Sequence, residues 1–369
     1  MSNTIREVLI KDEKNIKIHG RTVENRDPVT LVWTGSCIEM NVKCSELSIL
    51  LAGPYENYEN WIAIEINGAV LARHMIKKKK TWVKVFRGLN PAVVTNVKII
   101  KEVQAMHEDV EHCLKAYAVK LDGEILPVEE RPYKLEFIGD SITSGEGAFG
   151  AKQEEEWISM FFGHVHSYPY MVSKELNADY RVFSKSGWGI YCSWDNQPRL
   201  NIPSQYENIC SATFSEKLAK KGFCEKNDFA SWQPDAILVN LGTNDDGAFH
   251  NPAFTDENGV THKMRMKGDK YLKKDGDKVK NAAVEFLKIL RRNNENARIF
   301  WCYGMLGDGM KEILLAAIKE YKEETKDKKV AFLELPNTTE ETVGSRMHPG
   351  KASHEKAAKV IVKKLKSVL

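Results

Sequence analysis

The spacing of apolar residues changes about a third of the way along the chain. From about residue 16 to residue 121, short segments alternate apolar and polar positions, as in 38–43 and 62–66. A period of two buries one face of a strand and exposes the other, which is typical of antiparallel sheets. Asn67-Gly68 predicts a hairpin turn, because a type I′ turn needs positive φ at both central residues. Further strands are predicted at 47–51, 81–86, 96–103 and 115–121.

Several short strands without helices between them indicate a β-sandwich. Beyond residue 133, short apolar runs at 135–138, 236–241, 298–302 and 330–333 are separated by helical patterns. Between residues 278 and 292 the apolar positions form one helical stripe, and the C-terminal segment repeats this pattern. Strands that alternate with helices predict a three-layer α/β/α fold with a parallel sheet. We therefore expect a β-sandwich domain at 1–125 and an α/β domain at 133–369.

Composition and charge exclude several classes of protein. The 369 residues exceed the roughly 250–300 that one core usually holds, and the 42% hydrophobic content excludes a disordered chain. The net charge of +3 gives no reason to expect nucleic acid or a membrane surface as a partner. The charged N-terminal stretch and the seven cysteines, none spaced C-x-x-C, favour a cytoplasmic protein without a disulfide framework or a zinc site.

Chemically reactive residues follow the ends of the predicted parallel strands, where α/β sheets place their sites. These segments are Gly139-Asp140-Ser141-Ile142-Thr143, Ser186-Gly187-Trp188-Gly189, Gly242-Thr243-Asn244-Asp245 and His348-Pro349-Gly350. Ser141 is a candidate nucleophile, and His348 is the base that would accept its proton. Attack on an ester creates an oxyanion, which needs donors already in place. The backbone N–H groups of Ser141 and Gly187 and the side-chain amide of Asn244 are the candidates.

The order of these four segments resembles that of the SGNH (GDSL-type) hydrolases, over about residues 134–369. The resemblance implies that Ser141 is the nucleophile, that His348 is the base, and that Ser141, Gly187 and Asn244 form the oxyanion hole. With the predicted sandwich, segments 19–25, 32–39 and 301–307 look like the two-domain acetyl esterases of carbohydrate esterase family 2. That likeness implies a jelly-roll N-terminal domain and removal of O-acetyl groups from xylan or glucomannan, without a metal or an organic cofactor.

One position departs from the SGNH pattern, in which an aspartate stands three residues before the histidine. Ser345 occupies that position here. Family 2 esterases work with a Ser–His dyad whose imidazole is held by a backbone carbonyl, so the resemblance points to the carbonyl of Arg346 or of a neighbour. A carboxylate from elsewhere, such as Asp327 or Glu334, is the alternative. Loss of an orienting acid costs a serine protease about 10⁴ in kcat, so some group must hold the imidazole.

The substrate-binding residues are less well indicated than the catalytic ones. Of the aromatic residues near the strand ends, Trp188 and Trp301 are selected as sugar-stacking candidates. The glycine-rich stretch 145–150 is interpreted as a flexible loop beside Ser141. The expected partner is an acetylated oligosaccharide or polysaccharide, and the oligomeric state stays open. A lipid esterase or thioesterase, and a non-catalytic carbohydrate-binding protein, are the alternative functions.

Overall fold

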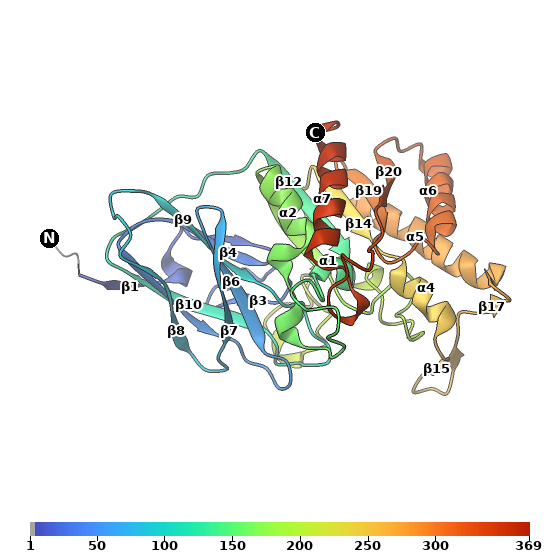
Figure 1. Ribbon diagram of the computed structural model, residues 1–369, viewed down its shortest axis with the longest axis horizontal. Coiled ribbons are helices and arrows are strands. Elements are labelled where there is room, and N and C mark those ends of the chain that lie inside the picture. The colour runs from blue at the N-terminus through green and yellow to red at the C-terminus, as the bar shows by residue number, and fades with distance from the viewer. Residues whose placement is uncertain (1–3) are drawn as a thin grey trace.

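The N-terminal half of the molecule is a sandwich of two antiparallel sheets. The computed structural model describes residues 4–369, and Figure 1 shows the sandwich beside a second, helix-covered sheet. One sheet has the order β1-β10-β5-β8 with β3 paired to β10, and the other has the order β11-β4-β9-β6-β7 with β2 paired to β4. The strands are β1 (Arg6–Leu9), β2 (Lys17–His19), β3 (Val29–Leu31), β4 (Cys37–Lys43), β5 (Glu46–Ala52), β6 (Asn60–Ile66), β7 (Ala69–Ile76), β8 (Thr81–Arg87), β9 (Thr95–Lys101), β10 (Leu114–Leu121) and β11 (Glu124–Leu126).

Alternating residues of the two sheets form the core of the sandwich. Ile38, Met40 and Val42 of β4 are buried in one cluster with Ile49 and Leu51 of β5. This is the period-two pattern that predicted these strands, so the apolar face of each sheet covers the other. The predicted hairpin between β6 and β7 is confirmed, since φ is 48° at its first turn residue and 80° at the glycine that follows.

A parallel sheet with the order β13-β12-β14-β19-β20 forms the C-terminal half. Its strands are β12 (Tyr133–Gly139), β13 (Ala178–Ser184), β14 (Ala236–Asn240), β19 (Arg298–Gly304) and β20 (Val330–Leu335). The helices α2 (Tyr168–Glu175) and α7 (Lys351–Lys366) pack on one face of the sheet, and α5 (Lys273–Asn293) and α6 (Lys311–Thr325) pack on the other. The predicted three-layer fold behind a β-sandwich is confirmed (Figure 1).

The shorter elements lie in the loops, all in this half except η1, which follows β1 of the sandwich. They are α1 (Ser141–Ser144), α3 (Glu216–Ala219), α4 (Thr243–His250), β15 (Phe254–Thr255), β16 (Thr261–His262), β17 (Met266–Lys267), β18 (Lys270–Tyr271), and the 3₁₀ turns η1 (Ile10–Asp12), η2 (Ser159–Phe161), η3 (His164–His166), η4 (Pro203–Gln205) and η5 (Ser345–Met347). The two small hairpins formed by β15–β18 have no counterpart in the sequence prediction. Within the described residues, no helix combines the length and the apolar character that crossing a bilayer requires.

The pairing of the strands changes from antiparallel to parallel between β11 and β12. The two-domain division at 1–125 and 133–369 stays a prediction, and residues 1–3 of its first segment lie outside the described residues. The halves are in close contact through polar side chains. Arg21, just after β2, is buried and pairs with Glu136 of β12 at 2.8 Å, and its guanidinium lies over the ring of Tyr206.

Candidate active site

The strand order of the parallel sheet has its topological switch point, the place where α/β folds carry a ligand crevice, between β12 and β14. The chain leaves β12 toward β13 on one side and returns to β14 on the other, so the two following loops diverge. Ligands bind at such switch points, beyond the carboxyl ends of the strands. Ser141 begins α1 directly after β12, and Asn244 lies in the first turn of α4 directly after β14. The fold therefore brings two of the predicted site residues to the same crevice.

The structure brings Ser141 and His348 into hydrogen-bond contact across 207 positions of sequence. His348 Nε2 lies 2.9 Å from Ser141 Oγ. His348 Nδ1 lies 2.8 Å from the carbonyl oxygen of Arg346, which can only accept. The ring therefore donates its Nδ1–H to that carbonyl, and its unprotonated Nε2 accepts from the serine hydroxyl. This is the tautomer that a general base needs.

The alternative orienting groups lie in other contacts. Asp327 pairs with Arg291 at 2.8 Å, and Glu334 pairs with Lys311 at 2.8 Å. Ser345 is buried, and its backbone carbonyl accepts the backbone N–H of His348. Among the two possibilities left open by the sequence, the carbonyl of Arg346 is thus the one in contact with the imidazole.

Asp140 stabilises the turn that carries the nucleophile, Ser141. Its Oδ1 accepts the backbone N–H of Ile142 at 3.0 Å, which caps α1 and fixes Ser141 as the first helical residue. Burial, together with the neighbouring carboxylates of Asp245 and Glu146, raises the pKa of Asp140 to about 7, although the hydrogen bond from Ile142 acts to lower it. Asp140 therefore has a structural role beside the nucleophile, because its carboxylate holds a turn amide.

Two of the expected oxyanion donors are available. In residues 4–369, the backbone N–H groups of Ser141 and Gly187 donate to no protein acceptor. Gly187 has a φ of 80°, in the left-handed region where a side chain would be strained. Asp245 fixes the loop that follows, since its carboxylate accepts the backbone N–H groups of Ile190 at 2.7 Å and Tyr191 at 2.8 Å. Asp245 therefore has a structural role beside the predicted oxyanion donors.

The amide of Asn244 lies beside these donors, but its hydrogens already have protein acceptors. Its Nδ2 lies 3.0 Å from the carbonyl oxygen of Trp188 and 3.2 Å from Asp140 Oδ2. An amide nitrogen carries two hydrogens, so an oxyanion would have to share or replace one of these contacts. The contact with Asp140 is the longer of the two. The oxyanion role of Asn244 stays a prediction.

The choice of Trp188 and Trp301 as sugar-stacking residues is wrong. Trp301 is 0% exposed and donates its indole N–H to the carbonyl of Leu241, while Trp188 is 1% exposed. A buried ring offers no face to a sugar. Trp194 is 50% exposed instead, and its backbone N–H donates to the carbonyl of Gly187. The sequence placed all three near strand ends, but only tertiary packing decides which ring stays exposed.

Glu146 is a site residue that the sequence did not single out. It lies in the loop after α1, is 4% exposed, and its Oε1 lies 3.8 Å from His348 Nε2. The same carboxylate pairs with Arg346 at 2.7 Å and accepts from the hydroxyl of Ser186 at 2.6 Å. The loop 145–150, interpreted as flexible, thus carries a buried, fully engaged acid next to the dyad.

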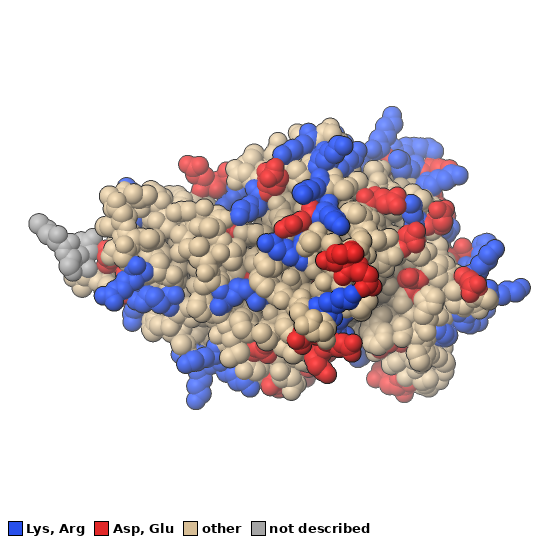
Figure 2. Space-filling view, viewed as in Figure 1, with Lys and Arg blue, Asp and Glu red and all other residues tan. Residues whose placement is uncertain are grey.

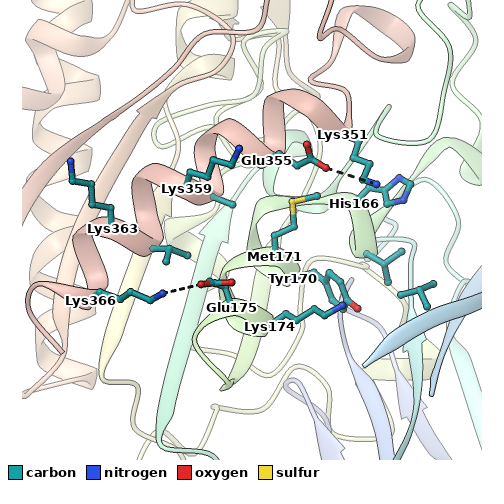
Figure 3. Close-up of a pocket in the computed structure, with 14 residues that line it drawn as sticks. His166, Tyr170, Met171, Lys174, Glu175, Lys351, Glu355, Lys359, Lys363 and Lys366 are labelled. Atoms are coloured by element: carbon teal, nitrogen blue, oxygen red, sulfur yellow. Dashed lines mark hydrogen bonds and ion pairs between the residues drawn. The ribbon is translucent and has the colours of Figure 1, made fainter. Parts of the chain in front are cut away.

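A cavity of about 1140 Å³ lies away from the dyad, between α2, α7 and the tip of β7 (Figure 3). Neither Ser141 nor His348 lines it. Its walls carry lysines and glutamates, and one pair joins the two helices, Lys366 of α7 with Glu175 of α2 at 2.8 Å. Figure 2 shows basic side chains gathered over α2 and α7 on this face. The cavity therefore does not supply the long apolar acyl cleft that a lipid esterase requires beside its nucleophile.

One cluster has the composition of a metal site. Ligand atoms of His19, Glu39 and Asp179 lie within 4.8 Å of one another. Both carboxylates already contact cationic side chains: Arg131 reaches Glu39 and Asp179, and Lys17 lies 2.8 Å from Asp179. These contacts make the cluster an ion-pair junction between β4 of the sandwich and β13 of the parallel sheet.

Comparison with known proteins gives the same interpretation for most of the chain. The family model "Carbohydrate esterase 2 N-terminal" matches residues 18–127. The structure of an acetyl xylan esterase, Est2A, from the rumen bacterium Butyrivibrio proteoclasticus superposes with a TM-score of 0.96 at 42% identity, covering 98% of each chain.

Two curated proteins are more distant relatives. Cellulase/esterase CelE of Acetivibrio thermocellus is 25% identical over 91% of this chain, and an acetylxylan esterase / glucomannan deacetylase of Cellvibrio japonicus is 27% identical over 32% of it. The chain spans only about a third of their length, 37% and 31% respectively. Because the likeness to Est2A covers 98% of the chain, and so includes both the sandwich and the parallel sheet, the chain belongs to carbohydrate esterase family 2.

Proposed function

We propose that this protein is a serine esterase that removes O-acetyl groups from plant polysaccharides or from their oligosaccharides. The observation that carries the proposal is the alignment of the Arg346 carbonyl, the His348 imidazole and the Ser141 hydroxyl, with contacts of 2.8 and 2.9 Å. The names of the relatives support the substrate class: one is an acetyl xylan esterase and another an acetylxylan esterase / glucomannan deacetylase.

In the first step, Ser141 Oγ attacks the acetyl carbonyl carbon while its proton passes to His348 Nε2. The resulting imidazolium keeps its Nδ1–H on the carbonyl of Arg346, so the ring does not turn away. The carbonyl oxygen of the ester becomes negative and accepts from the unoccupied N–H groups of Ser141 and Gly187. A third donor, the amide of Asn244, would exchange its contact with Asp140 for the oxyanion.

Collapse of this intermediate breaks the bond between the acetyl carbon and the sugar oxygen. His348 gives the Nε2 proton to that oxygen, and the deacetylated sugar leaves. Water then enters at the same position, His348 Nε2 takes its proton, and the acetyl group leaves as acetate with Ser141 restored. Each proton transfer uses the same nitrogen, so one oriented imidazole serves both halves of the reaction.

The exposed side chains around the dyad support a sugar in preference to a long acyl chain. Trp194 presents a half-exposed indole next to Gly187, and Met347, directly before His348, is 65% exposed. A flat indole at the rim of a polar crevice suits the apolar face of a pyranose ring. Trp194 replaces Trp188 and Trp301 as the residue that we propose to contact the substrate.

The test is release of acetate from acetylated xylan and glucomannan oligomers, compared with hydrolysis of long-chain acyl esters. We expect release from at least one acetylated oligomer, turnover of short esters only, and no release by Ser141→Ala. Preference for long acyl chains would favour the lipid esterase. Binding of the oligomers without release of acetate would favour the non-catalytic carbohydrate-binding protein.

A further inference from the structure

We propose that Glu146 is a positioning residue. Through Arg346 and Ser186 it fixes the base, His348, and the loop that carries Gly187 relative to each other. The inference rests on the proposed function, because it assigns a role in the reaction of the same site. Its starting point is a buried carboxylate next to a dyad that has no carboxylate on the Nδ1 side of its histidine.

The loop around Glu146 is built to turn this side chain inward. Gly145 and Gly147 on either side have φ values of 78° and 75°, which only glycine adopts without strain. The backbone N–H of Glu146 donates to the carbonyl of Ser141 at 3.0 Å, which ties the loop to the nucleophile's turn. The carboxylate is therefore fixed relative to Ser141 by a short, constrained segment of chain.

On the side of the base, Glu146 fixes Arg346. Its Oε1 accepts from Arg346 Nη1 at 2.7 Å, and the backbone N–H of Arg346 donates to the carbonyl of Glu154 at 2.7 Å. Arg346 and Met347 have φ values of 52° and 56°, so two consecutive side-chain-bearing residues occupy the left-handed region. Such a turn persists only when its surroundings hold it. The carbonyl that orients His348 belongs to this turn, so its direction depends on these contacts.

On the side of the oxyanion, Glu146 fixes Ser186, the residue directly before Gly187. Glu146 Oε2 accepts from Ser186 Oγ at 2.6 Å, and the backbone N–H of Ser186 donates to Gln104 Oε1 at 2.7 Å. One carboxylate therefore reaches both the loop with an oxyanion donor and the turn with the orienting carbonyl.

The carboxylate of Glu146 also lies close to the reacting nitrogen of His348. Its Oε1 lies 3.8 Å from His348 Nε2, the atom that carries the proton after attack by Ser141. The carboxylate of Glu146 therefore lies near the atom on which positive charge develops during the reaction. Both Oε atoms are engaged by Arg346 and Ser186, so Glu146 acts through its neighbours and does not itself take the proton of Ser141.

The first test is Glu146→Gln, which keeps the size of the side chain and removes its charge. We expect kcat on a short acetyl ester to fall about 10- to 100-fold with KM unchanged, since a coupled pair of this kind contributes to the reacting state and not to sugar binding. Glu155→Gln, an exposed acid in the same segment, is the control and should behave as wild type.

The second test is a double-mutant cycle with Arg346→Met. If Glu146 acts through Arg346, the double variant loses no more than the worse single variant, and Arg346→Lys recovers part of the loss. Unchanged kcat in Glu146→Gln would overturn the proposal, and so would losses that simply multiply. Thermal unfolding of each variant shows whether it folds. If Arg346→Met does not fold, the activity of Arg346→Lys relative to wild type decides.

A measurement independent of turnover separates this proposal from the proposed function. The ¹⁵N chemical shifts of His348 report which ring nitrogen carries the proton. We expect one tautomer, protonated at Nδ1, in the wild type and a mixture of tautomers in Glu146→Gln. An inactive wild type would overturn the esterase assignment alone. Identical tautomers in the two proteins would overturn the role of Glu146, whatever the activity.

Discussion

The molecule buries carboxylates in two regions, the contact between its halves and the ends of the parallel strands, and they serve different purposes there. In the sandwich, Glu39 and Glu65 are buried. Glu39 pairs with Arg131 of the segment that connects the halves, and Glu65 accepts a hydrogen bond from Tyr170 on α2. In the parallel-sheet half, Asp140, Asp245 and Glu146 are buried at the ends of strands or in the loops that follow. They accept hydrogen bonds from the backbone and side chains that shape the crevice.

The first group of carboxylates is therefore expected to determine stability, and the second group is expected to determine activity. A buried ion pair between the halves fixes how they dock, whereas a buried acid in the crevice fixes where a donor or a carbonyl points. Removing a partner in the first group should affect the free energy of unfolding and leave kcat unchanged. Removing a carboxylate or its partner in the second group should lower kcat more than it changes the free energy of unfolding. The substitutions below test this division.

The largest expected effect is on stability, at Arg131. Arg131→Met leaves Glu39 and Asp179, at 0% and 2% side-chain exposure, without their guanidinium partner. Removing one member of a buried pair costs about 3–5 kcal/mol of unfolding free energy. Chemical denaturation should show this loss, while Arg87→Met, at an 82% exposed side chain, should stay within about 0.5 kcal/mol of wild type. A large drop in kcat of the folded Arg131→Met protein would contradict the division.

The next effect is on activity, at Asn244. Asn244→Ala removes the third oxyanion donor, and the loss of one such donor costs about 10²–10³ in kcat. We expect this loss on a short acetyl ester with little change in the unfolding free energy. Asn258→Ala, in an exposed turn, is the control. An unchanged rate in Asn244→Ala would remove this residue from the oxyanion hole.

A pH-dependent effect is expected in the sandwich, at Lys101. Burial lowers the pKa of Lys101 from 10.5 to about 7. Between these values the unfolded chain binds a proton that the folded protein does not, so the contribution of Lys101 to stability increases as pH rises and is lost as pH falls toward 7.

The stability of wild type relative to Lys101→Met should therefore rise by about 1.4 kcal/mol per pH unit in the middle of that window, and it should level off below the lower and above the upper of the two pKa values. Denaturation at several pH values measures the difference, with the exposed Lys79→Met as a control. A difference that does not change with pH would mean that Lys101 stays charged when buried.

The smallest expected effect is at Ser345. Ser345→Asp restores an acid three positions before His348, but the carbonyl of Arg346 already accepts the Nδ1–H at 2.8 Å. Ser345 is also 1% exposed and packs against Gly150, so a larger, charged side chain has little room. We expect no gain in kcat and a lower melting temperature. A gain would show that the carbonyl orients the imidazole poorly.

The features that local patterns encode could be predicted from the sequence. Strand period, the Asn67-Gly68 turn and the segments around Ser141, Gly187 and His348 each depend on neighbouring residues, and the structure brings these segments together. The carbonyl of Arg346, one of the two alternatives considered for orienting His348, is the group in contact with its imidazole.

Features that depend on tertiary packing could not be predicted. Trp194 and Trp301 look alike in sequence, but one is half exposed and the other is enclosed by α5 and the sheet. Glu146 and Arg346 are 200 positions apart, and no local pattern indicates that their side chains pair. The glycines around Glu146 were the one available signal, since two left-handed positions beside an acid indicate a constrained loop.

The most direct test of the central claim is labelling with a serine-directed phosphonate, followed by peptide mapping. We expect one adduct, on Ser141, that is absent from Ser141→Ala and forms far more slowly in His348→Ala, because the hydroxyl then lacks its base. An adduct on another serine, or an unlabelled wild type that still releases acetate, would contradict this claim.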